Sequence, residues 1–204
     1  QVARGAWPSV RRAALAVIAI NWQLTEDWQG EFRSVGDDQV HFAANTLRCG
    51  SYITVKDGGY FILGNDDGAV SGGNHATVRL REQGTIRVKK GGTLRLARVS
   101  HLIVEPGAEL WIEEGANMEL WWSESTIQIQ GTLRMTGQFN FDGSGFLQFD
   151  ENHVMYLPED GFRLHGQGDR FLRLNKNTDW RLHDKALDLK NGAVEYADHA
   201  RISV

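Results

Sequence analysis

Residues 84–96 read GTIRVKKGGTLRL, residues 104–120 read VEPGAELWIEEGANMEL and residues 127–135 read IQIQGTLRM. Each segment repeats a triplet in which two apolar residues flank one variable residue, and the triplets recur about every eight residues. A period of two places successive side chains on opposite faces of a β-strand, so each triplet buries two residues and exposes one. The triplets therefore predict short strands that are joined by equally short corners.

The same triplet recurs along most of the chain. Triplets begin at Ile53, Phe61, Val78, Ile86, Leu94, Leu102, Leu110, Met118, Ile127, Leu133, Phe139, Leu147, Phe162, Leu172, Leu187, Val194 and Ile202. Because these intervals are too short for strand–helix–strand units, we expect coils of three strands and three bends, with roughly 24 residues per coil. The segment from Gly30 to Val204 then predicts an all-β, single-stranded right-handed β-helix (β-solenoid) of about seven coils.

Glycines precede several of these strands. Gly84, Gly92, Gly107, Gly115 and Gly131 each stand one or two residues before the next predicted strand. A sharp corner often needs a positive φ, which a β-carbon penalises. The glycines therefore predict corners with positive φ.

The N-terminal segment has a different pattern. Residues 8–20, which begin at Pro8, are rich in alanine and leucine and lack the period of two, so they predict an α-helix. The helix is apolar around its circumference and must be covered. We expect it to cap the first coil; docking onto another chain and a leftover export or membrane segment are the alternatives. Residues 1–29 and 30–204 are thus a capping segment and a solenoid that form one domain.

Composition agrees with one soluble domain. The chain has 204 residues, 41 % of them apolar, and a formal net charge of −4. No Ser/Gly-rich, Pro-rich or polyionic stretch marks a linker. The single cysteine, Cys49, excludes an internal disulfide and multi-cysteine metal sites and is expected to be a small buried residue.

Charge is distributed in two opposite segments. Residues 79–98 hold seven Lys and Arg against one Glu, and residues 99–133 hold six Glu with no Lys, Arg or Asp. In a solenoid these segments occupy neighbouring coils, so we expect charge ladders between coils that set register. A bipolar surface that docks onto another copy or a charged polymer is the alternative, whereas nucleic acid binding does not fit an acidic chain. The docking residues would form a basic and an acidic belt: Arg79, Arg81, Arg87, Lys89 and Arg95, then Glu105, Glu109, Glu113 and Glu119.

Three tryptophans are candidates for ligand or partner binding. Leu110 and Ile112 are expected to point into the core, so Trp111 between them points outward. Trp121 and Trp122 lie at a corner about one strand later. An outward tryptophan can stack on a sugar ring or on a partner protein, or a long loop or the N-terminal helix can cover it.

No residue pattern indicates catalysis. The seven histidines show no metal-ligand spacing, and no phosphate loop, dinucleotide fingerprint or nucleophile elbow is present. Paired acids such as Glu113-Glu114 and Glu159-Asp160 fall at predicted turns, where acids are common. We therefore predict no catalytic residue, no metal and no cofactor, and we favour a non-enzymatic protein.

The segment from Gly84 to Phe149 resembles the right-handed β-helix passenger and adhesin domains of bacterial or phage surface proteins. The resemblance is general, because the Asn-Pro-Asn-Gly signature, calcium-binding nonapeptides and Thr-x-Thr ladders of particular classes are absent. It implies an extended scaffold that is extracellular or on a cell or virion surface. No functional residue is carried over from it.

Two functions remain open. The first is a non-enzymatic structural or adhesive surface module that assembles with itself or binds another surface protein. The second is a β-helix that binds or cleaves carbohydrate, of the tailspike or polysaccharide lyase type, with a glycan as its partner. We expect neither nucleic acid as a partner nor a transmembrane span, because the longest apolar run is far shorter than a spanning helix.

Overall fold

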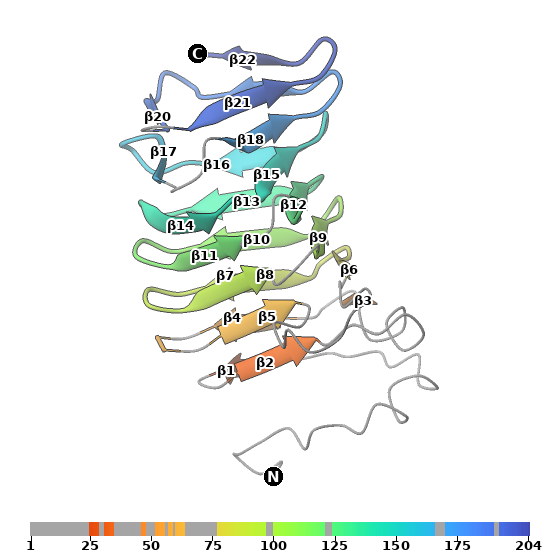
Figure 1. The fold of residues 1–204 in the computed structure, drawn as a ribbon, viewed down its shortest axis with the longest axis vertical. Coiled ribbons are helices and arrows are strands. Elements are labelled where there is room, and N and C mark those ends of the chain that lie inside the picture. Colours follow the sequence, from red (N-terminus) through yellow and green to blue (C-terminus); the bar gives the residue numbers. More distant parts are fainter. Residues whose placement is uncertain are drawn as a thin grey trace.

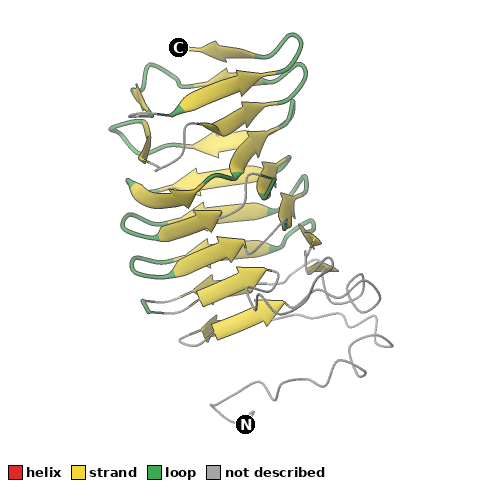
Figure 2. Ribbon diagram, viewed as in Figure 1, coloured by secondary structure: helices red, strands yellow, loops and turns green. Residues whose placement is uncertain are grey.

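The computed structural model describes residues 25–28, 31–34, 46–47, 52–55, 57–58, 60–63, 77–96, 100–120, 124–165, 170–189 and 192–204. These residues form strands and corners, with no helix among them (Figure 2). Every strand pair is parallel and joins two strands that are three places apart in chain order. The chain is therefore a β-solenoid, seen as a stack of turns from β1 to β22 (Figure 1).

Three sheets run along the solenoid. Sheet A contains β1 (Thr25–Trp28), β4 (Tyr52–Val55), β7 (Thr85–Val88), β10 (Glu109–Ile112), β13 (Thr132–Met135) and β16 (Val154–Tyr156). Sheet B contains β2 (Glu31–Ser34), β5 (Tyr60–Leu63), β8 (Thr93–Leu96), β11 (Asn117–Leu120), β14 (Phe139–Gly143), β17 (Phe162–His165) and β20 (Leu187–Asp188). Sheet C contains β3 (Thr46–Leu47), β6 (Thr77–Leu80), β9 (His101–Val104), β12 (Thr126–Ile129), β15 (Phe146–Phe149), β18 (Arg170–Leu174) and β21 (Ala193–Tyr196). A separate pair joins β19 (Asp179–Arg181) and β22 (Arg201–Ser203).

The number of turns is smaller than predicted. The structure shows about five turns, where the sequence predicted about seven. Regular turns with a strand on all three sheets run from β4 to β18. The prediction extrapolated this regularity to both ends, but β3 and β20 are only two residues long, and β19 pairs only with β22 among the described strands.

The alternation within each triplet is confirmed. In β10, Leu110 and Ile112 are fully buried, while Glu109 and Trp111 face outward and are partly exposed. The same alternation recurs in β7, β11, β12 and β13. One continuous apolar core therefore fills the solenoid.

Near the C-terminal end of the described chain, aromatic rings fill the core. Trp180 on β19 is fully buried and packs edge-on against Phe162, with ring centroids 4.9 Å apart. Its indole N–H donates to the sulfur of Met155 on β16, 25 residues earlier. This contact places β19 next to β16 in the following turn, although β19 pairs with β22 and is not part of sheet A.

The glycines at the corners have two different roles. Gly107 and Gly115 have positive φ values of 82° and 73°, as predicted. Gly84, Gly92 and Gly131 do not have positive φ, and here the prediction was wrong. An added β-carbon at Gly131 would lie 2.6 Å from the carbonyl oxygen of Ala108, and one at Gly84 would lie 2.6 Å from Leu80. Close packing rather than backbone conformation requires these glycines: Gly131 packs against the preceding turn, and Gly84 packs within its own corner.

Several predictions lie outside the described residues. They include the helix over residues 8–20, Cys49, and Trp121 and Trp122. The division of the chain at residues 29 and 30 likewise stays a prediction. Within the described ranges, no helix has the length and apolar character needed to cross a membrane.

Candidate functional site

The two charged belts neutralise each other across successive turns. Arg79 and Arg81 both pair with Glu105, Arg87 pairs with Glu113, and Arg95 pairs with Glu119 at 2.5 Å. The fourth belt carboxylate, on Glu109, pairs with Arg134 from the following turn at 2.5 Å. Lys89, the remaining belt residue, forms no ion pair with any residue that the structure describes. The ladder expected from the sequence is therefore present, and docking through the belts stays a prediction.

A column of stacked cations and rings runs along the outside of sheet A. Arg87, Trp111, Arg134 and Tyr156 occupy equivalent positions in four successive turns. The Arg87 guanidinium lies 3.8 Å from the Trp111 ring centroid, and the Arg134 guanidinium lies 4.3 Å from that of Tyr156. Arg134 also lies 5.6 Å from the centroid of Trp111. These distances are within the range of cation–π attraction.

The column changes the expected role of Trp111. The ring faces outward, as predicted, but the guanidinium of the preceding turn already stacks on it. Its indole N–H is buried and has no hydrogen-bond partner. A sugar ring would have to displace Arg87 from both Trp111 and Glu113. Covering by a neighbouring side chain is therefore the better description of Trp111, while ligand binding by this residue remains untested.

Among the residues whose burial the structure describes, the exposed large apolar side chains lie late in the chain. On β16, Val154 is 45 % exposed and Tyr156 is 50 % exposed, because both point out of sheet A. Tyr196 on β21 is 54 % exposed. We call the surface of Arg134, Val154, Tyr156 and Arg181 the docking face. Exposed apolar groups next to charged groups are typical of interaction sites.

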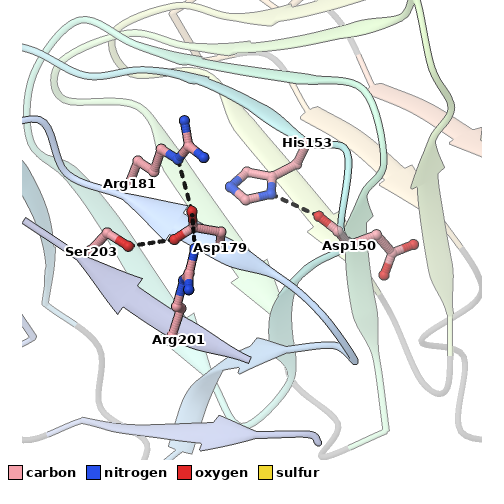
Figure 3. A network of polar contacts seen from close by, with 6 residues as sticks. All are labelled: Asp150, His153, Asp179, Arg181, Arg201 and Ser203. Carbon is pink, nitrogen blue, oxygen red and sulfur yellow. Dashed lines mark hydrogen bonds and ion pairs between the residues drawn. The ribbon is translucent and has the colours of Figure 1, made fainter. Parts of the chain in front are cut away.

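A cluster centred on Asp179 borders the docking face (Figure 3). Its carboxylate accepts hydrogen bonds from Arg181 at 2.9 Å, Arg201 at 3.0 Å and the hydroxyl of Ser203. The bonds from Arg201, Ser203 and Arg181, in that order, hold the pKa of Asp179 well below its usual range. Asp179 in turn raises the pKa of Arg201. Two exposed guanidinium groups thus share one carboxylate, which leaves this end of the face with an excess of positive charge.

His153 lies beside this cluster at the corner before β16 (Figure 3). Its Nδ1 is 2.7 Å from the carbonyl oxygen of Asp150, and its ring packs against Phe149 with centroids 5.1 Å apart. Burial lowers the pKa of His153, although Asp150 and Asp179 oppose the shift. The imidazole is therefore held in its neutral form at neutral pH.

A hollow of about 620 Å³ opens along the corners that follow the strands of sheet C, from the corner after β9 to the corner after β21. We call it the corner hollow; its lining includes Pro106, Gln130, Asp150, Asn175, Lys176 and Ala197. Four residues separate β9 from β10 and β15 from β16, whereas only Gln130 and Gly131 separate β12 from β13. The corner at Gln130-Gly131 lies between two corners of four residues each. Because it is two residues shorter than they are, the surface is recessed there.

The carboxylate of Asp150 organises the corner hollow. Its Oδ2 accepts the amide N–H groups of Gln128 at 2.6 Å and Gln130 at 2.9 Å. Its Oδ1 accepts the amide of Asn175 from the next turn. One carboxylate thereby fixes three carboxamides, two from the preceding turn and one from the following turn.

Among the described residues, no group of three or more His, Cys, Asp or Glu side chains is placed to hold a metal ion. The acids of Glu113-Glu114 and Glu159-Asp160 do lie at corners, as predicted. Sequence reasoning missed the docking face and the corner hollow. The usable signal for the hollow was the interval of six residues between the triplets at Ile127 and Leu133, against eight or more at most other positions.

No protein-family model matches the chain, and neither the curated proteins nor the solved structures include a significant match.

Proposed function

We propose that the chain is a non-enzymatic scaffold, a structural or adhesive module of an extracellular, cell or virion surface that assembles through the docking face. The observation that carries the proposal is the exposure of Val154 and Tyr156, which are about half exposed on the outer side of sheet A. In the preceding turns of sheet A, outward arginines pair with glutamates of a neighbouring turn, Arg87 with Glu113 and Arg134 with Glu109.

The partner that this surface fits best is a second copy of the chain. Sheet A carries arginines and glutamates that pair one to one in its middle turns. These near-neutral turns do not repel a second copy, and an antiparallel arrangement sets the positively charged Arg181 end of each copy against them, whereas a polyanion would meet their carboxylates. Two copies lying antiparallel would bury Val154 and Tyr156 against each other in an isologous contact.

Light scattering tests this proposal by measuring the molecular mass over a concentration series up to about 100 μM. This range detects self-association with a micromolar dissociation constant. We expect the mass to rise with concentration and the double variant Val154→Ser, Tyr156→Ser to remain monomeric. Tyr196→Ser is the matched control, because Tyr196 is equally exposed but lies on β21. A constant monomer mass, or association of the double variant like the unchanged chain, would contradict the proposal.

Carbohydrate binding, the second candidate, is favoured by a different observation, the corner hollow. Asp150 and Glu151 are both present there, but Asp150 already accepts three amide hydrogen bonds. A carboxylate so engaged is a poor proton donor or nucleophile, whereas glycoside cleavage needs a pair of available carboxyl groups. The hollow therefore favours binding over cleavage.

A further inference from the structure

The amide groups in the corner hollow have a fixed orientation. An ionised carboxylate can only accept hydrogen bonds, so Gln130 and Asn175 must turn their NH₂ groups towards Asp150. Their carbonyl oxygens then point away from the carboxylate. The hollow consequently offers hydrogen-bond acceptors whose orientation is set before any ligand arrives, which reduces the entropy lost on binding.

The charges of the lining favour a neutral ligand. Asp150 and Glu151 supply two carboxylates, and Lys176 supplies one ammonium group. The excess of negative charge disfavours anionic ligands. Lys176 remains as a hydrogen-bond donor beside the amide acceptors, so a ligand that both donates and accepts fits this set.

The hollow is elongated along the solenoid. Its lining residues belong to five successive corners, from Pro106 to Ala197, which at the spacing of parallel strands spans roughly 19 Å. Its volume of about 620 Å³ falls within the usual range of ligand sites. An extended chain of small polar units matches this shape better than a single compact ligand.

We propose that the corner hollow binds a neutral oligosaccharide that lies along the solenoid axis. Hydroxyl groups of the sugar donate to the amide oxygens of Gln130 and Asn175, and Lys176 donates to sugar oxygens. The inference rests on carbohydrate binding and is independent of assembly through the docking face, so either can fail alone.

The test is a titration of the full chain with cellohexaose and maltohexaose, followed through the side-chain amide signals of Gln130 and Asn175 in ¹H–¹⁵N NMR spectra. We expect at least one of the two probes to shift these signals with a saturable, millimolar or tighter affinity. Tri-galacturonate, an anionic probe, should bind at least about tenfold more weakly, which corresponds to about 1.4 kcal/mol.

An insertion into one corner tests whether the hollow binds the ligand while the fold is kept. Replacing Gln130-Gly131 by Gln-Pro-Gly-Ala copies the length of the corner at residues 105–108 and should fill the recess while the turns still stack. This variant, and separately Asn175→Leu, should lose at least about tenfold in affinity. Asn140→Leu is the control, because Asn140 belongs to another amide ladder, on sheet B, where it donates to Asn117.

Two results would overturn the proposal. The first is the absence of any shift at Gln130 and Asn175 with either neutral probe at about 20 mM, well above a weak millimolar dissociation constant. The second is unchanged binding by the insertion variant when its circular dichroism shows the same strand content. Loss of self-association in the Val154→Ser, Tyr156→Ser variant would not affect either result.

Discussion

Single arginine side chains in this solenoid each serve more than one neighbour. Arg134 pairs with Glu109 at 2.5 Å and also stacks over the ring of Tyr156 at 4.3 Å. Arg87 likewise pairs with Glu113 and stacks on Trp111. The planar guanidinium can do both at once, because its edge donates hydrogen bonds while its face lies on a ring. A lysine has no such face.

Replacing Arg134 separates these two contributions. Arg134→Lys should keep the ion pair with Glu109 but lose the planar stacking, at a cost of about 0.5–1 kcal/mol. Arg134→Gln should lose both and cost more. Urea unfolding of the two variants measures the free energies, and equal stability of Arg134→Lys and the unchanged chain would show that stacking contributes nothing.

His153 makes stability depend on pH. Because burial lowers its pKa in the folded chain, the unfolded chain binds the proton more readily, starting near its ordinary value of 6.5. Stability is therefore highest above that pH and falls as the pH decreases through 6.5 towards the folded pKa. His153→Gln, which cannot be protonated, should flatten this part of the curve. Melting temperatures of both proteins, measured between about pH 7 and about pH 5, check this prediction. If the melting temperatures of the unchanged chain and of His153→Gln fell equally with pH, His153 would be excluded as the cause.

At the level of strands and corners, close stacking between successive turns decides which residues are tolerated. Gly131 packs against the backbone of the preceding corner at Glu105 and Ala108, whereas Gly58 has φ +70° and open space around it. Strand pairing adds the ion-pair ladder, in which Arg95 on β8 faces Glu119 on β11.

Asparagine substitutions distinguish the two kinds of glycine. Gly58→Asn should be nearly neutral, because asparagine tolerates a positive φ better than other residues and nothing lies within 4 Å. Gly131→Asn should cost about 1–3 kcal/mol through overpacking. Melting temperatures measured side by side test this, and similar losses at both positions would contradict the packing argument.

Exchanging the charges of one ladder pair tests its role in stacking. Arg95→Glu places two carboxylates on neighbouring strands and should cost about 1–3 kcal/mol, since both side chains are mostly shielded from solvent. The double exchange Arg95→Glu, Glu119→Arg should restore most of this loss. A double-mutant cycle from urea unfolding gives the coupling energy, and a double variant as unstable as the single one would show that the pair does not set register.

For the whole molecule, the sequence predicted the architecture but not its working surfaces. The triplets from Thr85 to Met135 correctly predicted strands, because two inward apolar residues mark each of them. β16 escaped notice because only Met155 points inward there, while Val154 and Tyr156 are apolar and outward. The same departure from the pattern creates the docking face.

The corner hollow was equally hidden in the sequence. An interval of six residues between two triplets indicates a short corner, but a recess also depends on the longer corners stacked on both sides. The contacts of Asp150 join residues 20 to 25 positions away, a distance set by the length of each turn. Without the register between turns, those amides cannot be assigned to one site.

Photo-cross-linking from sheet A tests the central claim, assembly through the docking face, most directly. Benzoylphenylalanine is introduced at the position of Tyr156 and, in a parallel sample, at that of the equally exposed Tyr196. We expect position 156 to yield a covalent dimer in which mass spectrometry locates the link on sheet A of the second copy, and position 196 to yield little. No dimer from position 156, or equal yields from both positions, would contradict the account.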